Sequence, residues 1–115
     1  MDKPEFNPLP LFTLIMAYEA GALDATLAAA AGDDAQLFSE LREAFIESLS
    51  RQVDLLGRAR CDGNWQITAL RIKGLAASFH ADPLMSLAEE ALDAAPGDPV
   101  VVRQIRTFLD NYAAG

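Results

Sequence analysis

Apolar residues recur at intervals of three and four positions along most of this chain, which is the spacing of one face of an α-helix. The longest regular pattern occupies residues 35–59 and consists of Phe38, Leu41, Phe45, Leu49, Val53 and Leu56. Charged residues take the other side. In the pairs Glu47–Arg51 and Asp54–Arg58 the acid precedes the base by four residues, the favourable order for an ion pair on a helix. We expect one long amphipathic helix with a solvated outer side.

Turn-forming residues divide the rest of the chain into further helical segments. Pro10 suits the first position of a helix, and Gly21 is expected to end or weaken that helix before it resumes. Gly32 and the two aspartates after it predict a break followed by a capped helix start. Further breaks are expected at residues 61–64, at Asp82-Pro83, where the aspartate would cap a helix with proline in its first turn, and at residues 96–99.

The segments between these breaks repeat the helical spacing. Their apolar stripes are Leu11, Leu14, Ile15 and Tyr18; Trp65, Ala69, Ile72, Ala76 and Phe79; Leu84, Leu87, Ala88, Ala91 and Leu92; and Val101, Ile105, Phe108 and Tyr112. No alternating strand pattern of convincing length competes with them. Helices with one apolar stripe, joined by short turns, predict an all-α fold. We expect an antiparallel up-and-down four-helix bundle with an additional N-terminal helical segment. It would form a single domain over residues 10–115, after an extended tail over residues 1–9.

The composition is that of a globular protein, since 51% of the 115 residues are hydrophobic and 23% are charged. A chain of this length suits one domain with a buried core. The 9 basic and 17 acidic residues give a net charge of −8. This charge argues against nucleic acid, whose binding needs a dense basic patch, and against an anionic membrane surface. It is compatible with a protein partner that has a basic docking face.

Residues that usually carry catalysis or bind metals are scarce. Cys61 is the only cysteine and His80 the only histidine, so an internal disulfide and the usual zinc sites are ruled out, and we expect no metal or other cofactor. A Ser/His/Asp triad would have to use His80, and no nucleophile elbow is present. The acidic residues are expected to be solvated, which gives no basis for acid–base chemistry. We therefore expect a protein that is not an enzyme.

The apolar stretch at residues 9–18 bears on where the protein resides. It is shorter than the about 20 residues that a membrane-spanning helix needs. As a signal peptide it would follow Asp2 and Glu5 with only Lys3 as a cation, and no clean cleavage site is present. The stretch is therefore interpreted as a structural helix, and the single cysteine favours a reducing, cytoplasmic location.

The helix expected over residues 65–79 has an unusual second face. Its apolar stripe points inward, whereas Leu70, Lys73, Gly74 and Ala77 lie on another face, at relative angles of about 0°, −60°, +40° and −20°. A glycine inside a helix costs roughly 1 kcal/mol relative to alanine. A flat patch beside a cation is one reason to accept this cost, because another backbone can then approach closely. We expect these four residues to bind a partner.

The stretch "LRIKGLAASFHADPLMSLAEEAL" at residues 70–92 resembles the signature helix of histidine-containing phosphotransfer (HPt) domains. In that family the pattern reads His-x-x-Lys-Gly, followed by small residues, Phe-Gly-Ala and a further helix. Lys73 and Gly74 match the Lys-Gly pair. The apolar, small and aromatic positions around this pair are matched by Ile72, Ala76, Ala77, Ser78, Phe79 and Ala81. With the long acidic helix before it, the resemblance covers most of the chain from about Leu23 onward.

Two positions depart from the HPt pattern. The family's phosphoacceptor histidine falls on Leu70, which has no nucleophilic atom and cannot carry phosphate, and the glycine after the phenylalanine is His80. The resemblance implies a phosphorelay signalling module that binds a response-regulator receiver domain or a histidine kinase without being phosphorylated, a pseudo-HPt module. The family lysine supports the phosphate charge, and here Lys73 is expected to contact an acidic receiver pocket.

Two other interpretations are open at this point. A structural or oligomerising bundle explains the same stripes by packing alone, and it predicts that Leu70 and Ala77 are buried in the fold or in a dimer contact. Phosphotransfer through His80 is the other. Extrapolated along the helix, His80 lies about 20° off the same face, but at the helix end, where an imidazole also suits the helix dipole. The sequence specifies neither the individual partner nor the oligomeric state.

Overall fold

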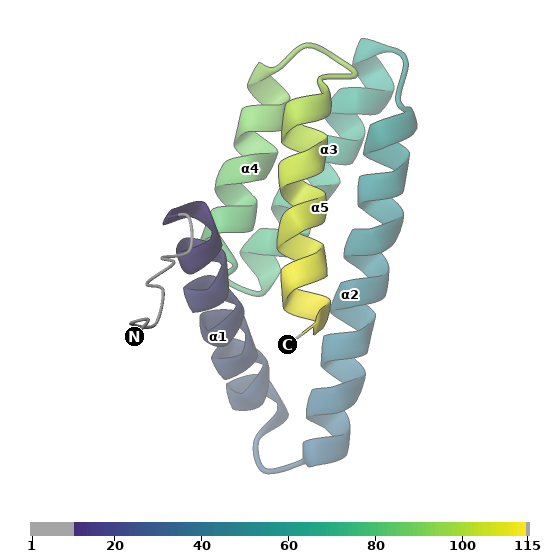
Figure 1. Ribbon diagram of the computed structural model, residues 1–115. Coiled ribbons are helices and arrows are strands. Elements are labelled where there is room, and N and C mark those ends of the chain that lie inside the picture. The colour runs from purple at the N-terminus through teal and green to yellow at the C-terminus, as the bar shows by residue number, and fades with distance from the viewer. Residues whose placement is uncertain (1–10, 115) are drawn as a thin grey trace, which may run out of the picture.

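The computed structural model describes the backbone of residues 11–114 and the side chains of residues 21–114. Every regular element in this part of the chain is an α-helix (Figure 1): α1 (Leu11–Ala31), α2 (Ala35–Arg58), α3 (Asp62–Ser78), α4 (Asp82–Asp93) and α5 (Pro99–Ala114). The all-α prediction is confirmed, and each of the five described helices begins or ends close to a predicted break. The predicted tail at residues 1–9, Pro10 and the first apolar stripe lie outside the described residues or side chains.

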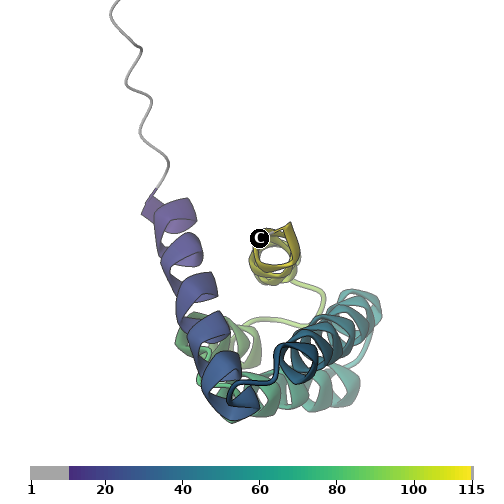
Figure 2. The same cartoon turned by 90° about the horizontal axis from the view of Figure 1, so that it is seen from below.

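The helices pack in a ring of neighbours. α2 lies against α3 and α5, and α4 also lies against α3 and α5, whereas the backbones of α3 and α5 do not come close to each other, nor do those of α2 and α4. The chain reverses direction at each connection (Figure 1). α1 packs against α2, α5 and α4. It is strongly tilted relative to α5, as the view from below shows (Figure 2).

The core forms where the predicted apolar stripes of α2, α3, α4 and α5 meet. Most of these side chains are fully buried, and four are partly buried: Phe38, Leu41, Phe79 and Leu92. Trp65 is the largest buried side chain, and its indole N–H donates a hydrogen bond of 2.6 Å to the main-chain oxygen of Ala91. This bond ties α3 to α4 in the interior and satisfies the one polar atom of the indole ring.

Gly21 does not end the first helix, contrary to the expectation from sequence. α1 continues through it to Ala31, and Leu23 and Leu27 in the following turns are fully buried. A glycine inside a helix costs only about 1 kcal/mol, whereas burying a leucine side chain contributes about 1.5–3 kcal/mol. The free energy gained by burying the two leucines therefore exceeds the cost of the glycine in the helix.

A polar cluster joins α1 to α2 and α5. The Tyr112 hydroxyl donates a hydrogen bond of 2.6 Å to the Asp24 carboxylate. Arg42 donates a bond of 2.6 Å to the main-chain oxygen of Tyr112, lies 3.7 Å from the same carboxylate and stacks 4.7 Å from the centre of the Tyr112 ring. Burial raises the pKa of the Tyr112 hydroxyl above its ordinary value, and the hydrogen bond to Asp24 adds to the rise.

The predicted break at residues 61–64 is shorter than expected. α3 begins at Asp62, because residues 62–64 form its first turn, with the Trp65 N–H bonded to the Cys61 oxygen at 3.1 Å. Asp34 caps α2 as predicted, by accepting the Leu37 N–H at 3.0 Å. Asp82 is the first residue of α4 rather than its cap, and no side chain caps that helix.

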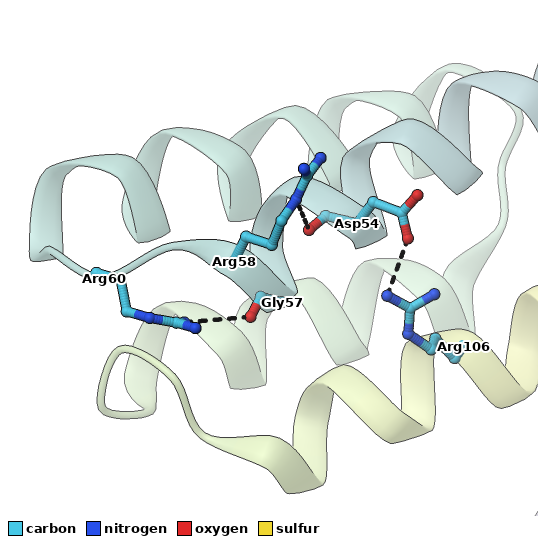
Figure 3. Close-up of polar contacts among 5 residues, drawn as sticks. All are labelled: Asp54, Gly57, Arg58, Arg60 and Arg106. Carbon is cyan, nitrogen blue, oxygen red and sulfur yellow. Dashed lines mark hydrogen bonds and ion pairs between the residues drawn. The ribbon is translucent and has the colours of Figure 1, made fainter.

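The two predicted ion pairs along α2 do not form within the described residues. Asp54 instead pairs with Arg106 of α5 at 2.9 Å, and Arg58 donates a longer bond of 3.4 Å to the main-chain oxygen of Asp54 (Figure 3). Glu47 and Arg51 make no ion pair with each other. The neighbouring helix therefore offers Asp54 a better partner than its own helix does.

Candidate functional site

The two faces of α3 lie in opposite environments. Its inner face, made of Trp65, Ala69, Ile72 and Ala76, is buried, so the predicted rotation of the helix is confirmed. Leu70 points outward and is 54% exposed. The outer face of α3 is defined here by Leu70, Lys73, Gly74 and Ala77, and α3 carries all four of them on the surface side of the inner stripe.

Lys73 lies at the edge of the outer face that borders α4. Its ammonium is 3.3 Å from the Glu89 carboxylate of α4, and both side chains are substantially exposed. Exposed ion pairs of this kind contribute little to stability, about 0–1 kcal/mol. The pair orients the lysine and offsets part of its charge, yet leaves it accessible to a partner.

Gly74 and Ala77 form the flat part of the outer face. A Cβ atom built at Gly74 would have no neighbour within 4 Å outside its own helix, so nothing inside the molecule requires a glycine there. The Gly74 oxygen accepts a bond of 2.9 Å from the Ser78 hydroxyl. Ala77 is exposed one turn further along. Packing within the chain therefore does not explain why the residues at these two positions are so small.

His80 lies beyond the end of α3 and not on its outer face. The last helical residue is Ser78, and His80 has a left-handed backbone with a φ of 55°. The His80 N–H bonds the Ala77 oxygen at 3.3 Å and the Ala81 N–H bonds the Ala76 oxygen at 2.8 Å, which together make a Schellman motif. Extrapolating the helix to His80 was therefore wrong, because the chain leaves the helix before it.

The Schellman motif explains what this position requires. Its left-handed residue is usually glycine, since a Cβ atom there costs roughly 1–2 kcal/mol. The HPt pattern has glycine at the position of His80. The present chain keeps the geometry with a histidine, whose side chain is exposed.

No cluster suited to a metal ion is found elsewhere. Within residues 21–114, no three histidine, cysteine, aspartate or glutamate side chains are arranged to hold one. Cys61 is exposed just before α3.

Among the described helices, none combines the length and the apolar content needed to cross a bilayer.

Two exposed apolar side chains beside the outer face were not singled out by the sequence pattern. Ile67 lies one turn before Leu70 and is 50% exposed, and Leu55 of α2 is 42% exposed. They line a hollow of about 350 Å³ between α2 and α3, together with Arg58 and Arg71. The signal available in the sequence was the apolar Ile67–Leu70 spacing outside the inner stripe. Leu55 depends on how α2 and α3 pack, which the sequence does not reveal.

Comparisons with protein-family models, with curated proteins and with solved structures found no match. The HPt resemblance therefore rests on the residues of α3 and of the helix that follows it.

Proposed function

We propose that this chain is a pseudo-HPt module that binds a response-regulator receiver domain or a histidine kinase through the outer face of α3 and carries no phosphate. One observation supports the proposal most. The side chain at the acceptor position, Leu70, is exposed on the outer face beside Lys73 and Gly74, where an HPt domain would present its histidine. A leucine there leaves the surface without a nucleophile.

The packing of the helices supports the same proposal. We propose that α2, α3, α4 and α5 form an antiparallel up-and-down four-helix bundle, with α1 packed on it as the additional segment. In such a bundle each helix touches its two neighbours and not the helix diagonally opposite. The observed contacts follow this rule, since the α2–α4 and α3–α5 diagonals are absent.

The surface chemistry fits binding better than catalysis. The outer face offers an apolar side chain, a flat patch and one cation that is already paired with Glu89. An acidic pocket of a receiver could compete with Glu89 for Lys73, because the existing pair is exposed and weak. The outer face itself supplies no group that could accept or transfer phosphate.

The exposure of Leu70 and Ala77 leaves only one form of the structural or oligomerising alternative. It predicted that both are buried in the fold or in a dimer contact. Within one chain neither is buried, so this alternative now requires a contact between two copies through the outer face. Sedimentation velocity of the purified chain separates the two, since a monomer at micromolar concentration contradicts the oligomerising form.

Binding to isolated receiver domains encoded in the same genome tests the proposal. We expect at least one receiver to bind the parent chain in a biolayer interferometry screen. The double variant Lys73→Glu with Gly74→Arg should weaken that binding at least about tenfold, because it reverses the cation and fills the flat patch.

A matched control carries the same kinds of change on α5, whose backbone does not come close to that of α3. Arg103→Glu with Ala113→Arg alters two exposed residues there and should leave receiver binding nearly unchanged. Far-UV circular dichroism establishes that both variants are folded. Equal binding by the parent and the Lys73/Gly74 variant would rule out docking through the outer face.

A further inference from the structure

The hollow between α2 and α3 is lined by large apolar side chains that the described surface exposes. Five such side chains are exposed, and two of them, Leu55 and Ile67, line this hollow. A third, Leu70, follows Ile67 by one helical turn. Apolar residues scattered singly over a surface need no explanation, but a group around a hollow marks a place where something binds.

The charge of this groove is opposite to that of the protein. Both charged residues that line it are arginines, Arg58 and Arg71, whereas the whole chain has a net charge of −8. Neither arginine forms an ion pair with a carboxylate among the described side chains. The groove is therefore a local site for negative charge.

Asp54, which precedes Arg58 by four residues on α2, is already engaged on the other side of α2. The Asp54 carboxylate accepts a hydrogen bond of 2.9 Å from the Arg106 guanidinium. Arg58 donates only to the main-chain oxygen of Asp54, at 3.4 Å. Figure 3 shows the Arg58 side chain pointing away from α5 and Arg106. The charge of Arg58 is left available at the α3 side, where the groove lies.

We propose that the groove defined by Leu55, Arg58, Ile67 and Arg71 binds an acidic amphipathic helix of a partner protein. The apolar side chains of that helix would enter between Leu55 and Ile67, and its carboxylates would bind the guanidinium groups of Arg58 and Arg71. A helix lying in a groove between two helices is a common recognition mode, and arginine is enriched in such interfaces because it binds carboxylates with two parallel hydrogen bonds.

This inference goes beyond the proposed phosphorelay role and does not depend on it. The groove lies on the α2 side of α3, whereas Lys73 pairs with Glu89 on the α4 side. A partner helix could therefore occupy the groove whether or not a receiver binds the outer face. Substitutions of Lys73 and Gly74 test the outer face, and substitutions of Ile67 and Arg71 test the groove.

A selected peptide provides the probe. A phage-displayed library of random peptides of about 16 residues, roughly four helical turns, is selected against the purified full chain. We expect the enriched peptides to combine apolar residues at helical spacing with flanking aspartate or glutamate. The most enriched one is synthesised with a fluorescent label, and its binding is measured by fluorescence anisotropy at low and high salt.

Two matched pairs of variants locate the binding. Arg71→Glu should weaken binding of the peptide at least about tenfold. Arg103→Glu on α5 makes the same charge change and should leave peptide binding nearly unchanged. Ile67→Ser should weaken it similarly. Val100→Ser is its control, because Val100 is 49% exposed on α5 and Ile67 is 50% exposed on α3. High salt should weaken binding of the peptide to the parent chain, because it screens the attraction between the arginines and the peptide carboxylates.

Four results would overturn the proposal. The first three are a failure of the selection to yield any binder, enriched peptides that are basic or uncharged, and equal binding by the Arg71 or Ile67 variant and its control. A fourth is a dimer of the parent chain, in sedimentation velocity, that dissociates on Ile67→Ser. That result would assign the groove to a second copy of this chain.

Discussion

The inner and outer faces of α3 share one backbone but differ in what accounts for their residues. On the inner face, Trp65 donates a hydrogen bond to the Ala91 oxygen, and Ile72 and Ala76 are fully buried. On the outer face, Leu70 is half exposed and a Cβ atom at Gly74 would touch nothing outside its own helix. Packing explains the first set and leaves the second unexplained, so the outer face is where a binding function is to be sought.

The largest expected effect contrasts Trp65 with Leu70. Trp65→Ala should lower the free energy of unfolding by about 3–5 kcal/mol, because it opens a cavity and removes the indole hydrogen bond to the Ala91 oxygen, which keeps only its bond from the Ala94 N–H. Leu70→Ala should change it by less than about 0.5 kcal/mol, as expected for a surface position. Urea denaturation followed by far-UV circular dichroism measures both. A large loss on Leu70→Ala would show that the outer face also supports the fold.

A sharper contrast uses two adjacent alanines. Ala76 is fully buried and Ala77 is exposed. Ala76→Leu should destabilise the protein by about 1–3 kcal/mol, because the added methyl groups have no space in the core. Ala77→Leu should be close to neutral in the same denaturation experiment. On the outer-face proposal, Ala77→Leu should nevertheless weaken receiver binding, so stability and binding separate at this position.

The comparison extends to α1 through the partly buried polar cluster of Tyr112, Asp24 and Arg42. Tyr112→Phe should lower the free energy of unfolding by about 1–2 kcal/mol near neutral pH, because it removes the hydrogen bond to the Asp24 carboxylate. Since folding raises the pKa of Tyr112, the unfolded chain loses this proton first as the pH rises above about 10. The parent should therefore lose stability above that pH, and Tyr112→Phe should lose less.

The second tyrosine, Tyr18, is present in both proteins, so the difference between their stability–pH curves belongs to Tyr112. Denaturation midpoints measured from pH 8 to pH 11 supply the curves. Parallel curves for the two proteins would show that the Tyr112 proton is not linked to folding.

The smallest expected effect is a gain in stability at Gly74. Gly74→Ala should raise the free energy of unfolding by about 0.5–1 kcal/mol, because alanine is the better helix former and its Cβ meets open space. The same substitution should not improve receiver binding. A loss of stability would mean that the glycine serves the fold, and would remove one reason to regard the outer face as a binding surface.

The inner face of α3 could be predicted from sequence because helical spacing alone places Trp65, Ala69 and Ile72 on one side. The same spacing also predicted the outer face, because it places the remaining residues of the helix on the other side. By contrast, Asp24, Arg42 and Tyr112 are far apart in sequence, and only the packing of α1 against α2 and α5 brings them together. Their individual types gave no sign of a shared cluster, since each is common on helix surfaces.

Two errors have a local cause. Gly21 was expected to end or weaken a helix because local propensity disfavours it, but the burial of Leu23 and Leu27 decides the outcome. His80 was placed by extending the helix, although the chain adopts a left-handed residue there. Glycine is the usual signal for that geometry, and the sequence has histidine instead.

Phosphate transfer tests the central claim most directly. The purified chain is mixed with radiolabelled phospho-receivers and active histidine kinases from the same genome, and label and complex formation are followed together. The account predicts a complex with a receiver or kinase and no acid-labile phosphate on the chain, because Leu70 stands where the acceptor histidine would be. Label on the chain that disappears with His80→Gln would contradict the account and make this protein a phosphotransfer protein.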